Sequence, residues 1–242
     1  MSALRRRFGA LLAVSALAAA LAGCGGTSDK DRSTSLDGLS GAEVIARAVD
    51  ATADARTLRL RFTADTDRAH VLTDLHRAAD GTCFGRMEFH TRTVTVIMTG
   101  AYTYVRASAS YWRQFDVPEF GQRMARTPST WARVKTADLY RRFCDVRELA
   151  ADNMLLLDRL EDMQVGAERD GPDGRTVVDV TNAEGDPAVV IDADAPHHVL
   201  EMRFSTSESV SRTVLSEFDE PAEVQVPPEG EYIPFDRLVV SL

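Results

Sequence analysis

The chain has 242 residues, with 28 Lys and Arg against 37 Asp and Glu, a formal net charge of −9 and only three cysteines. This length fits one domain or two small ones, and 44% hydrophobic with 27% charged residues is typical of a globular protein. The net negative charge argues against nucleic-acid binding, which needs a basic face. Three cysteines without a Cys-x-x-Cys pair exclude a disulfide-framework miniprotein, a zinc ribbon and a thioredoxin-type site.

The first 24 residues have the pattern of an export signal. Three arginines, Arg5 to Arg7, precede an apolar run over 10–22. A run of this length suits a signal-peptide core and is too short for a transmembrane helix of about 20 residues. It ends in Leu21-Ala22-Gly23-Cys24, which resembles a bacterial lipobox, where the peptide is cut before a cysteine that accepts diacylglycerol. The alternative is an ordinary signal peptide followed by an unrelated cysteine.

The lipobox predicts where the protein lies. Residues 1–23 would be removed, and Cys24 would anchor the chain on the extracytoplasmic side of the cell membrane through two or three acyl chains such as palmitate, since one chain binds only marginally. Cleavage removes three arginines and no acid, so the formal charge changes from −9 to −12. An acidic body is repelled by an anionic bilayer. We therefore expect the lipid, and not a basic patch, to provide the membrane attachment.

Composition divides the mature chain into a tether, 24–39, and one domain, 40–242. The tether is rich in Gly, Ser, Thr and Asp, and a flexible segment of this length reaches about 20 Å. The domain begins with Ser40 and Glu43 at the spacing of a helix capping box. Apolar residues then recur at helical spacing, which predicts a helix over 41–54.

From residue 58 the apolar period changes to two, which predicts strands with short connections. We expect strands near 58–63, 69–78, 82–90, 93–98, 101–106, 176–181, 188–192, 199–205 and 212–218. The middle segment, 110–162, has a helical pattern with an apolar stripe at Val146, Leu149, Met154, Leu157 and Leu160. The predicted fold class is α+β: a curved antiparallel β half-barrel of about 10–11 strands, with helices packed on the concave face.

Three further segments resemble those of a known group. They are Tyr102 to Arg106 followed by Trp112, the strand pair over 191–200, and Phe218-Asp219-Glu220-Pro221 with Pro227-Pro228. Together with the lipobox, the tether and the order of elements, they resemble the LolA-like superfamily, and more narrowly the LppX/LprG type of actinobacterial lipoprotein. The resemblance covers nearly the whole mature chain.

The resemblance implies a half-barrel that encloses an apolar cavity for the acyl chains of a lipid or lipoglycan, which such proteins carry through the envelope. It implies no catalytic residues and no cofactor, and we expect a monomer. The alternative function is a non-catalytic tethered module that binds a partner protein at the cell surface.

Nine apolar strand residues are candidates for the lining of the cavity. The alternative is that they form a filled core, because periodicity does not separate the two interpretations. The nine are Leu58, Leu60, Phe62, Val94, Val96, Met98, Leu200, Met202 and Phe204.

Cys83 and Cys144 remain after Cys24 is lipidated, and an even pair in an oxidising compartment predicts one disulfide. The alternative is two unpaired buried thiols. His197 and His198 are adjacent, and neighbours on a strand point to opposite faces, so we expect a solvated turn there and no metal site. No Gly-x-Ser-x-Gly, Ser-x-x-Lys, His-Glu-x-x-His or phosphate-loop motif occurs. We therefore expect no enzyme, although a triad built from distant residues stays open.

Overall fold

The computed structural model describes residues 35–66, 70–90, 92–114, 117–135, 143–154, 162–182, 187–205 and 209–235. The predicted signal peptide, Cys24 and most of the tether lie outside these residues, so the lipid anchor remains a prediction. From Leu36 onward the chain forms one compact unit. No helix among the described residues is long and apolar enough to cross a membrane.

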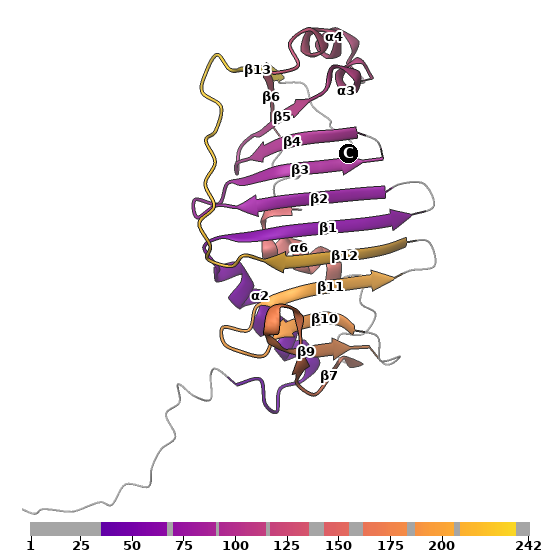
Figure 1. Ribbon diagram of the computed structural model, residues 1–242, viewed down its shortest axis with the longest axis vertical. Helices are drawn as coiled ribbons and strands as arrows, with labels where there is room; N and C mark the ends of the chain where they lie inside the picture. Colours follow the sequence, from indigo (N-terminus) through magenta and orange to yellow (C-terminus); the bar gives the residue numbers. More distant parts are fainter. Residues whose placement is uncertain are drawn as a thin grey trace, which may run out of the picture. The chain divides into compact units, whose positions relative to one another are not determined.

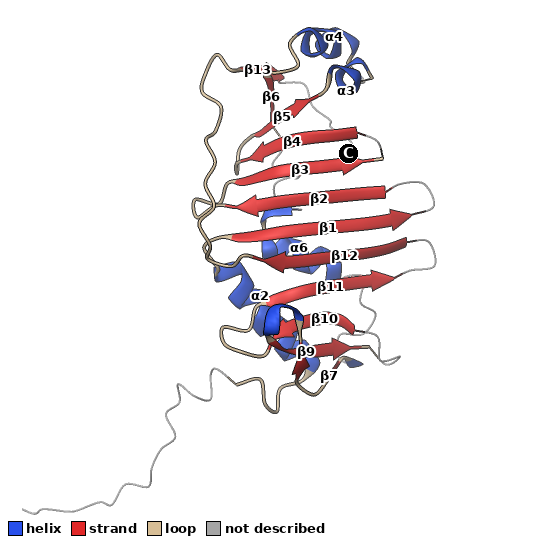
Figure 2. Cartoon of the chain, in the orientation of Figure 1, coloured by secondary structure: helices blue, strands red, loops and turns tan. Residues whose placement is uncertain are grey.

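The unit is built on one open sheet of thirteen strands (Figures 1 and 2). The strands are β1 Leu58–Thr66, β2 His70–Arg77, β3 Cys83–Phe89, β4 Arg92–Met98, β5 Thr103–Ala107, β6 Trp131–Val134, β7 Gln164–Val165, β8 Arg169–Asp170, β9 Thr176–Thr181, β10 Pro187–Asp192, β11 Val199–Ser205, β12 Ser209–Ser216 and β13 Tyr232–Phe235. Their order is β13-β6-β5-β4-β3-β2-β1-β12-β11-β10-β9-β7, with β8 beside β9. Every pair is antiparallel except β13 with β6.

The α+β fold class and the mostly antiparallel sheet are confirmed, with two more strands than the upper estimate. The difference lies partly in β6, which falls inside the segment predicted to be helical. Trp131 to Val134 are only four residues, so their periodicity is weak. They become a strand because they pair with β5 on one side and with β13 on the other.

Four α-helices lie in the described part of the chain. They are α2 Gly41–Asp54, α3 Ala109–Arg113, α4 Pro118–Arg126 and α6 Val146–Met154, with a 3-10 turn, η2, at Pro172–Gly174. Helices α2 and α6 pack together, and α2 also packs on β9, β10 and β11. Helices α3 and α4 pack on each other at the other end of the sheet, near β5, β6 and β13 (Figure 2). The predicted helical cover is therefore divided between two regions.

Helix α2 begins where the capping box predicted. The Ser40 side chain accepts a hydrogen bond from the Glu43 backbone, and the Glu43 carboxylate accepts one from the Ser40 backbone N–H at 2.8 Å. The hydrogen bonds from Ser40 lower the pKa of Glu43. The Thr52 hydroxyl accepts from Val199 N–H at 2.8 Å. This bond joins the last turn of α2 to the start of β11.

Two apolar clusters lie on the helix-facing side of the sheet. The larger, cluster A, joins α2 and α6 to β1 and β9–β12, and contains Val44, Ile45, Ala48, Val49, Leu58, Leu60, Val146, Leu149, Ala150, Met163, Val178, Val180, Val189, Ile191, Val199, Met202, Phe204 and Leu215. Cluster B joins α3 and α4 to β2–β6, and contains Leu75, Cys83, Met87, Val94, Val96, Met98, Ala107, Trp112, Met124, Ala132 and Cys144. Of the predicted apolar stripe, Val146 and Leu149 lie in cluster A, while Leu157 and Leu160 lie outside the described residues.

Cys83 and Cys144 form a disulfide, as predicted, with their Cα atoms 6.0 Å apart. Both residues are buried in cluster B. The bond links β3, in the middle of the sheet, to the residues just before α6. It therefore links the segment before α6 to the sheet, between two residues that are 61 positions apart in the sequence.

We predict that replacing both cysteines, Cys83→Ala with Cys144→Ala, lowers the free energy of unfolding by up to about 4 kcal/mol, because the crosslink limits the unfolded chain. Urea unfolding of the oxidised wild type and of the double variant measures this difference. Two reactive thiols in denatured wild-type protein that has not met a reductant would contradict the disulfide.

Candidate functional site

The strand register places the nine predicted cavity residues on the sheet. Leu58, Leu60, Met202 and Phe204 lie in cluster A, and Phe62 packs against it. Val94, Val96 and Met98 lie in cluster B. The structure therefore brings eight of the candidates to the helix-facing side of one sheet, in two groups.

Leu200 is the exception, because a β-bulge interrupts the alternation of β11. Ile191 pairs with Val199, whereas the preceding Val190 pairs with Glu201, so Leu200 is the additional residue. It packs with Val177, Val190 and Phe218 in a separate cluster. The expectation that Leu200 shares a face with Met202 and Phe204 is wrong for this reason.

Phe62 lies at the centre of the helix-facing side, between two threonines. Thr73 on β2 and Thr213 on β12 are its direct partners in the two neighbouring strands. Their exposed fractions are 0% and 1%. The hydroxyl oxygens of both threonines have no hydrogen-bond partner among the described residues. The Phe62 ring meets Phe143 edge to face, with 6.4 Å between the ring centroids.

Such hydroxyls are unusual in a folded protein, where buried polar side chains nearly always have a partner. A buried hydroxyl without a partner costs about 1–3 kcal/mol. We call Phe62, Thr73 and Thr213 the central strip. Sequence periodicity did not single out the two threonines, because Thr is a common strand residue on either face.

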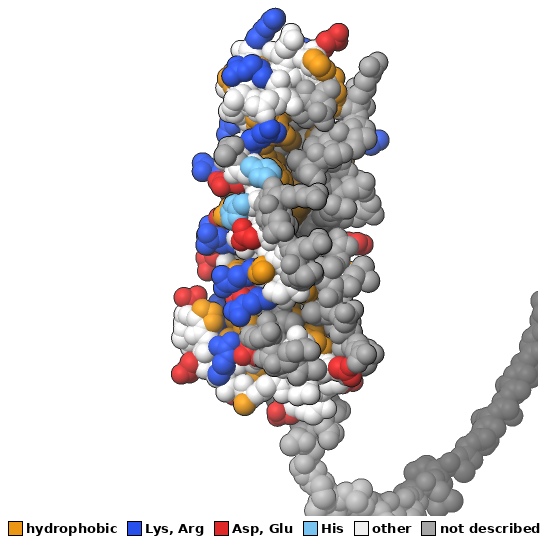
Figure 3. All heavy atoms as spheres, turned by 90° about the vertical axis from the view of Figure 1, so that its right-hand side faces the viewer, with side chains coloured by type: hydrophobic (Ala, Val, Ile, Leu, Met, Phe, Trp, Pro, Cys, Tyr) orange, Lys and Arg blue, Asp and Glu red, His pale blue; other side chains and the backbone are white. Residues whose placement is uncertain are grey.

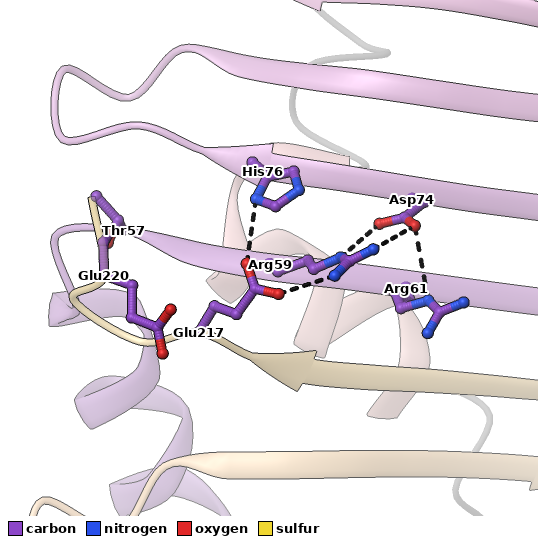
Figure 4. Close-up of polar contacts among 7 residues, drawn as sticks. All are labelled: Thr57, Arg59, Arg61, Asp74, His76, Glu217 and Glu220. Carbon is purple, nitrogen blue, oxygen red and sulfur yellow. Dashed lines mark hydrogen bonds and ion pairs between the residues drawn. The ribbon is translucent and has the colours of Figure 1, made fainter. Parts of the chain in front are cut away.

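On the opposite face, the part over β1, β2 and the end of β12 is polar and carries ion pairs (Figure 4), whereas the part over β3–β6 carries a further apolar cluster of Ile97, Tyr104 and Trp131. Arg59 on β1 donates from Nε and Nη2 to the Asp74 carboxylate, both at 2.8 Å, and from Nη1 to Glu217 at 2.8 Å. The Nδ1 atom of His76 lies 3.5 Å from Glu217. The hydrogen bond from Arg59 lowers the pKa of Asp74. Charge thus joins β1 to β2 and to the residue that follows β12, on the side away from clusters A and B.

The same face has a groove of about 570 Å³ between residues 169–175 and strands β10–β12. At its floor Glu201 accepts hydrogen bonds from Arg212 Nε at 2.7 Å and Nη2 at 2.8 Å, and also from Arg203. Burial alone would raise the pKa of Glu201, but these two arginines bring it below the usual range. Phe218 lines the apolar part of the groove.

His197 and His198 differ from the solvated turn that we expected. Both are buried beside the groove. The Nδ1 atom of His197 lies 3.1 Å from the Asp192 backbone oxygen, and the His198 ring stacks on Phe218 with centroids 4.0 Å apart. Burial lowers the pKa of His198. Within the described ranges, no three His, Cys, Asp or Glu side chains are grouped to hold a metal ion.

We predict that Asp74→Asn lowers the free energy of unfolding at pH 7 by about 1–2 kcal/mol, because it removes a two-point hydrogen bond to a charged partner. The folded-state pKa of Asp74 is lowered, so its contribution is present above the ordinary carboxyl pKa and is lost as the pH falls through the folded value. Urea unfolding between pH 7 and pH 3 should show the difference shrinking in acid. The exposed Glu223→Gln is the control, and an equal effect of the two variants would contradict the prediction.

No protein-family model matches this chain, and no curated protein matches its sequence. Solved structures do match its fold. LppX, a lipoprotein of Mycobacterium tuberculosis, is 14% identical, with 76% of this chain and 98% of that chain covered and a TM-score of 0.46. LprF of Mycobacterium bovis is 12% identical, with 77% and 96% covered and a TM-score of 0.47.

A LolA superfamily protein of Nitrosomonas europaea is 9% identical, with 77% of this chain and 96% of that chain covered and a TM-score of 0.27. These likenesses concern the course of the chain and say nothing about a ligand. In the course of its backbone, this chain is similar to LppX and LprF, as the sequence resemblance implied.

Proposed function

We propose that this chain is a lipid-anchored extracytoplasmic protein that binds the acyl chain of a lipid or lipoglycan against the helix-facing side of its sheet, for transfer within the cell envelope. Binding would involve no chemical change of the ligand. The observation that carries the proposal is the central strip, where two fully buried hydroxyls lack partners in the middle of an apolar surface.

An acyl lipid matches both properties of this surface. Its methylenes would contact the apolar side chains of clusters A and B, and each one removed from water contributes about 0.8 kcal/mol. Its ester or carboxyl oxygens would accept hydrogen bonds from Thr73 and Thr213, which otherwise have no acceptor among the described residues. A ligand without polar atoms would leave both hydroxyls unsatisfied.

The central strip lies between the two regions where the described helices pack. Helix α2 packs on β9–β11, and α3 and α4 pack on each other at the far end. Phe62, Thr73 and Thr213 belong to β1, β2 and β12, which lie between those two regions. The predicted anchor at Cys24 and the tether to residue 39 would keep this surface close to a lipid source.

The groove on the opposite face favours the second candidate function, a tethered module that binds a partner protein. It combines the buried Glu201 and its arginines with an apolar wall at Phe218, a mixture that suits a polypeptide. In that case the helix-facing side would be a filled core and the protein would bind no lipid.

The central strip gives a direct test. We predict that Thr73→Val with Thr213→Val raises the stability of the empty protein, because Val removes two unsatisfied hydroxyls at the same volume. The same variant should bind a fluorescent phosphatidylcholine about fivefold or more weakly, because each lost hydrogen bond contributes about 1 kcal/mol. Fluorescence titration and urea unfolding of the full chain measure the two effects.

Two controls make the outcome specific. Thr73→Ser with Thr213→Ser keeps the hydroxyls and should retain the affinity, whereas Thr95→Val changes a threonine whose partners Arg86 and Arg106 place it on the opposite face. No binding of the probe by the wild type would contradict lipid binding. Equal affinities of the Val and Ser variants would remove the role of the hydroxyls.

A further inference from the structure

The charges of the domain are segregated along the sheet, although the chain as a whole is acidic. The described residues from 83 to 135, which form β3–β6, α3 and α4, contain eight basic residues and two acidic ones. The basic residues are Arg86, Arg92, Arg106, Arg113, Arg123, Arg126, Arg133 and Lys135, and the acidic ones are Glu88 and Glu119. Figure 3 shows Lys and Arg side chains at the end of the molecule where α3 and α4 lie.

Three of these arginines differ from those of the other end in having no acidic partner. Arg113 closes α3, and Arg123 and Arg126 lie in the last turn of α4. All three are exposed, and no carboxylate in the described part of the chain forms an ion pair with them. By contrast, the arginines that pair with carboxylates are Arg56, Arg59, Arg61, Arg147, Arg169, Arg175, Arg203 and Arg212.

An exposed apolar side chain accompanies the three arginines. Val117, directly before α4, has an exposed fraction of 37% and is one of two large hydrophobic residues that are exposed in the described ranges. The opposite side of α4 is fixed to the protein by Met124, which is fully buried in cluster B. Basic groups beside an exposed apolar group on an anchored helix are typical of a surface that contacts a lipid bilayer.

We propose that Arg113, Arg123, Arg126 and Val117, which we call the basic cap, form a docking surface for a membrane that contains anionic phospholipids. Charge complementarity identifies this partner: unpaired guanidinium groups attract phosphate headgroups, and Val117 contacts the interface between headgroups and acyl chains. The proposal rests on the charge distribution and does not depend on lipid binding at the central strip.

The acidic net charge of the chain does not prevent this contact. Charges farther apart than about 8 Å are largely screened at physiological salt. Asp116, the sequence neighbour of Val117, lies outside the described residues; among the described residues Glu119 lies in α4, and the ion-paired carboxylates belong mainly to β1, β2 and β9–β12. A membrane at the basic cap therefore meets mostly positive charge.

The basic cap lies far from the start of the domain along the sheet. The chain begins its domain at Leu36 and Leu39, which pack against cluster A on the side of α2. The basic cap lies by the other end of the sheet (Figure 1). With about 4.8 Å between neighbouring strands, the two ends of the sheet lie roughly 50 Å apart along it. A protein anchored at one end thus presents a second membrane contact at the other.

The test uses the full chain with Cys24→Ala, so that no acyl chain is attached there. Its binding to sedimenting vesicles of phosphatidylcholine alone is compared with binding to vesicles that also contain phosphatidylglycerol. The charge variant Arg113→Gln, Arg123→Gln and Arg126→Gln is compared with Arg56→Gln, Arg61→Gln and Arg147→Gln, a control that removes the same charge from exposed, ion-paired arginines outside residues 83–135. The N-terminal segment is common to all variants.

We expect the charge variant to bind the anionic vesicles roughly 10- to 100-fold more weakly than the control, because each basic side chain near an anionic surface adds to the affinity for that surface. Added salt should weaken the binding of the wild type to anionic vesicles. The substitution Val117→Ser should also lower this binding. Thermal unfolding should not change, because the replaced side chains are exposed. Equal binding of the charge variant and the control, equal binding to both kinds of vesicle, or tighter binding to a DNA duplex than to anionic vesicles would overturn the proposal.

Discussion

The fold is organised by the need to bury one apolar face of the sheet. An open sheet of this width presents a long row of apolar side chains on one side, which the described helices cover in two regions. Helices α2 and α6 build cluster A, and α3 and α4 build cluster B. The disulfide between Cys83 and Cys144 fastens the segment before α6 to β3. Between the two clusters lies the central strip, where Thr73 and Thr213 are fully buried but their hydroxyls have no hydrogen-bond partner among the described residues.

The opposite face meets a different requirement, because it must remain soluble while its strands stay aligned. It does so with charges placed opposite each other on neighbouring strands. Arg59 bridges Asp74 and Glu217, and Glu201 binds Arg203 and Arg212. Partly buried ion pairs of this kind add modest stability but favour one register over another. Between residues 83 and 135, no described arginine forms an ion pair with a described carboxylate, and the basic cap is the part of this region where we infer a contact.

Much of this fold was predictable from local patterns. The alternation in β1 and the capping box of α2 report their structure directly, because a short strand or a helix start is governed by neighbouring residues. β6 was not predictable, since four residues become a strand only through their partners β5 and β13. The bulge at Leu200 was equally hidden, because nothing in an alternating sequence marks an inserted residue.

The candidate site shows the same division. Eight of the nine apolar candidates share the predicted face, yet the two threonines of the central strip were missed, because burial of a strand hydroxyl is set by the whole sheet. Net charge does not report a local basic surface for a similar reason, since it averages over parts of the chain that differ in sign.

Native mass spectrometry of the full chain released from bacterial membranes, combined with organic extraction, would show whether the protein carries a lipid. We expect a mature chain that carries covalent acyl groups at Cys24 and one additional acyl lipid, bound without a covalent bond and recovered in the extract. A chain whose mass shows no bound lipid, and which takes up none from added vesicles, would contradict this expectation.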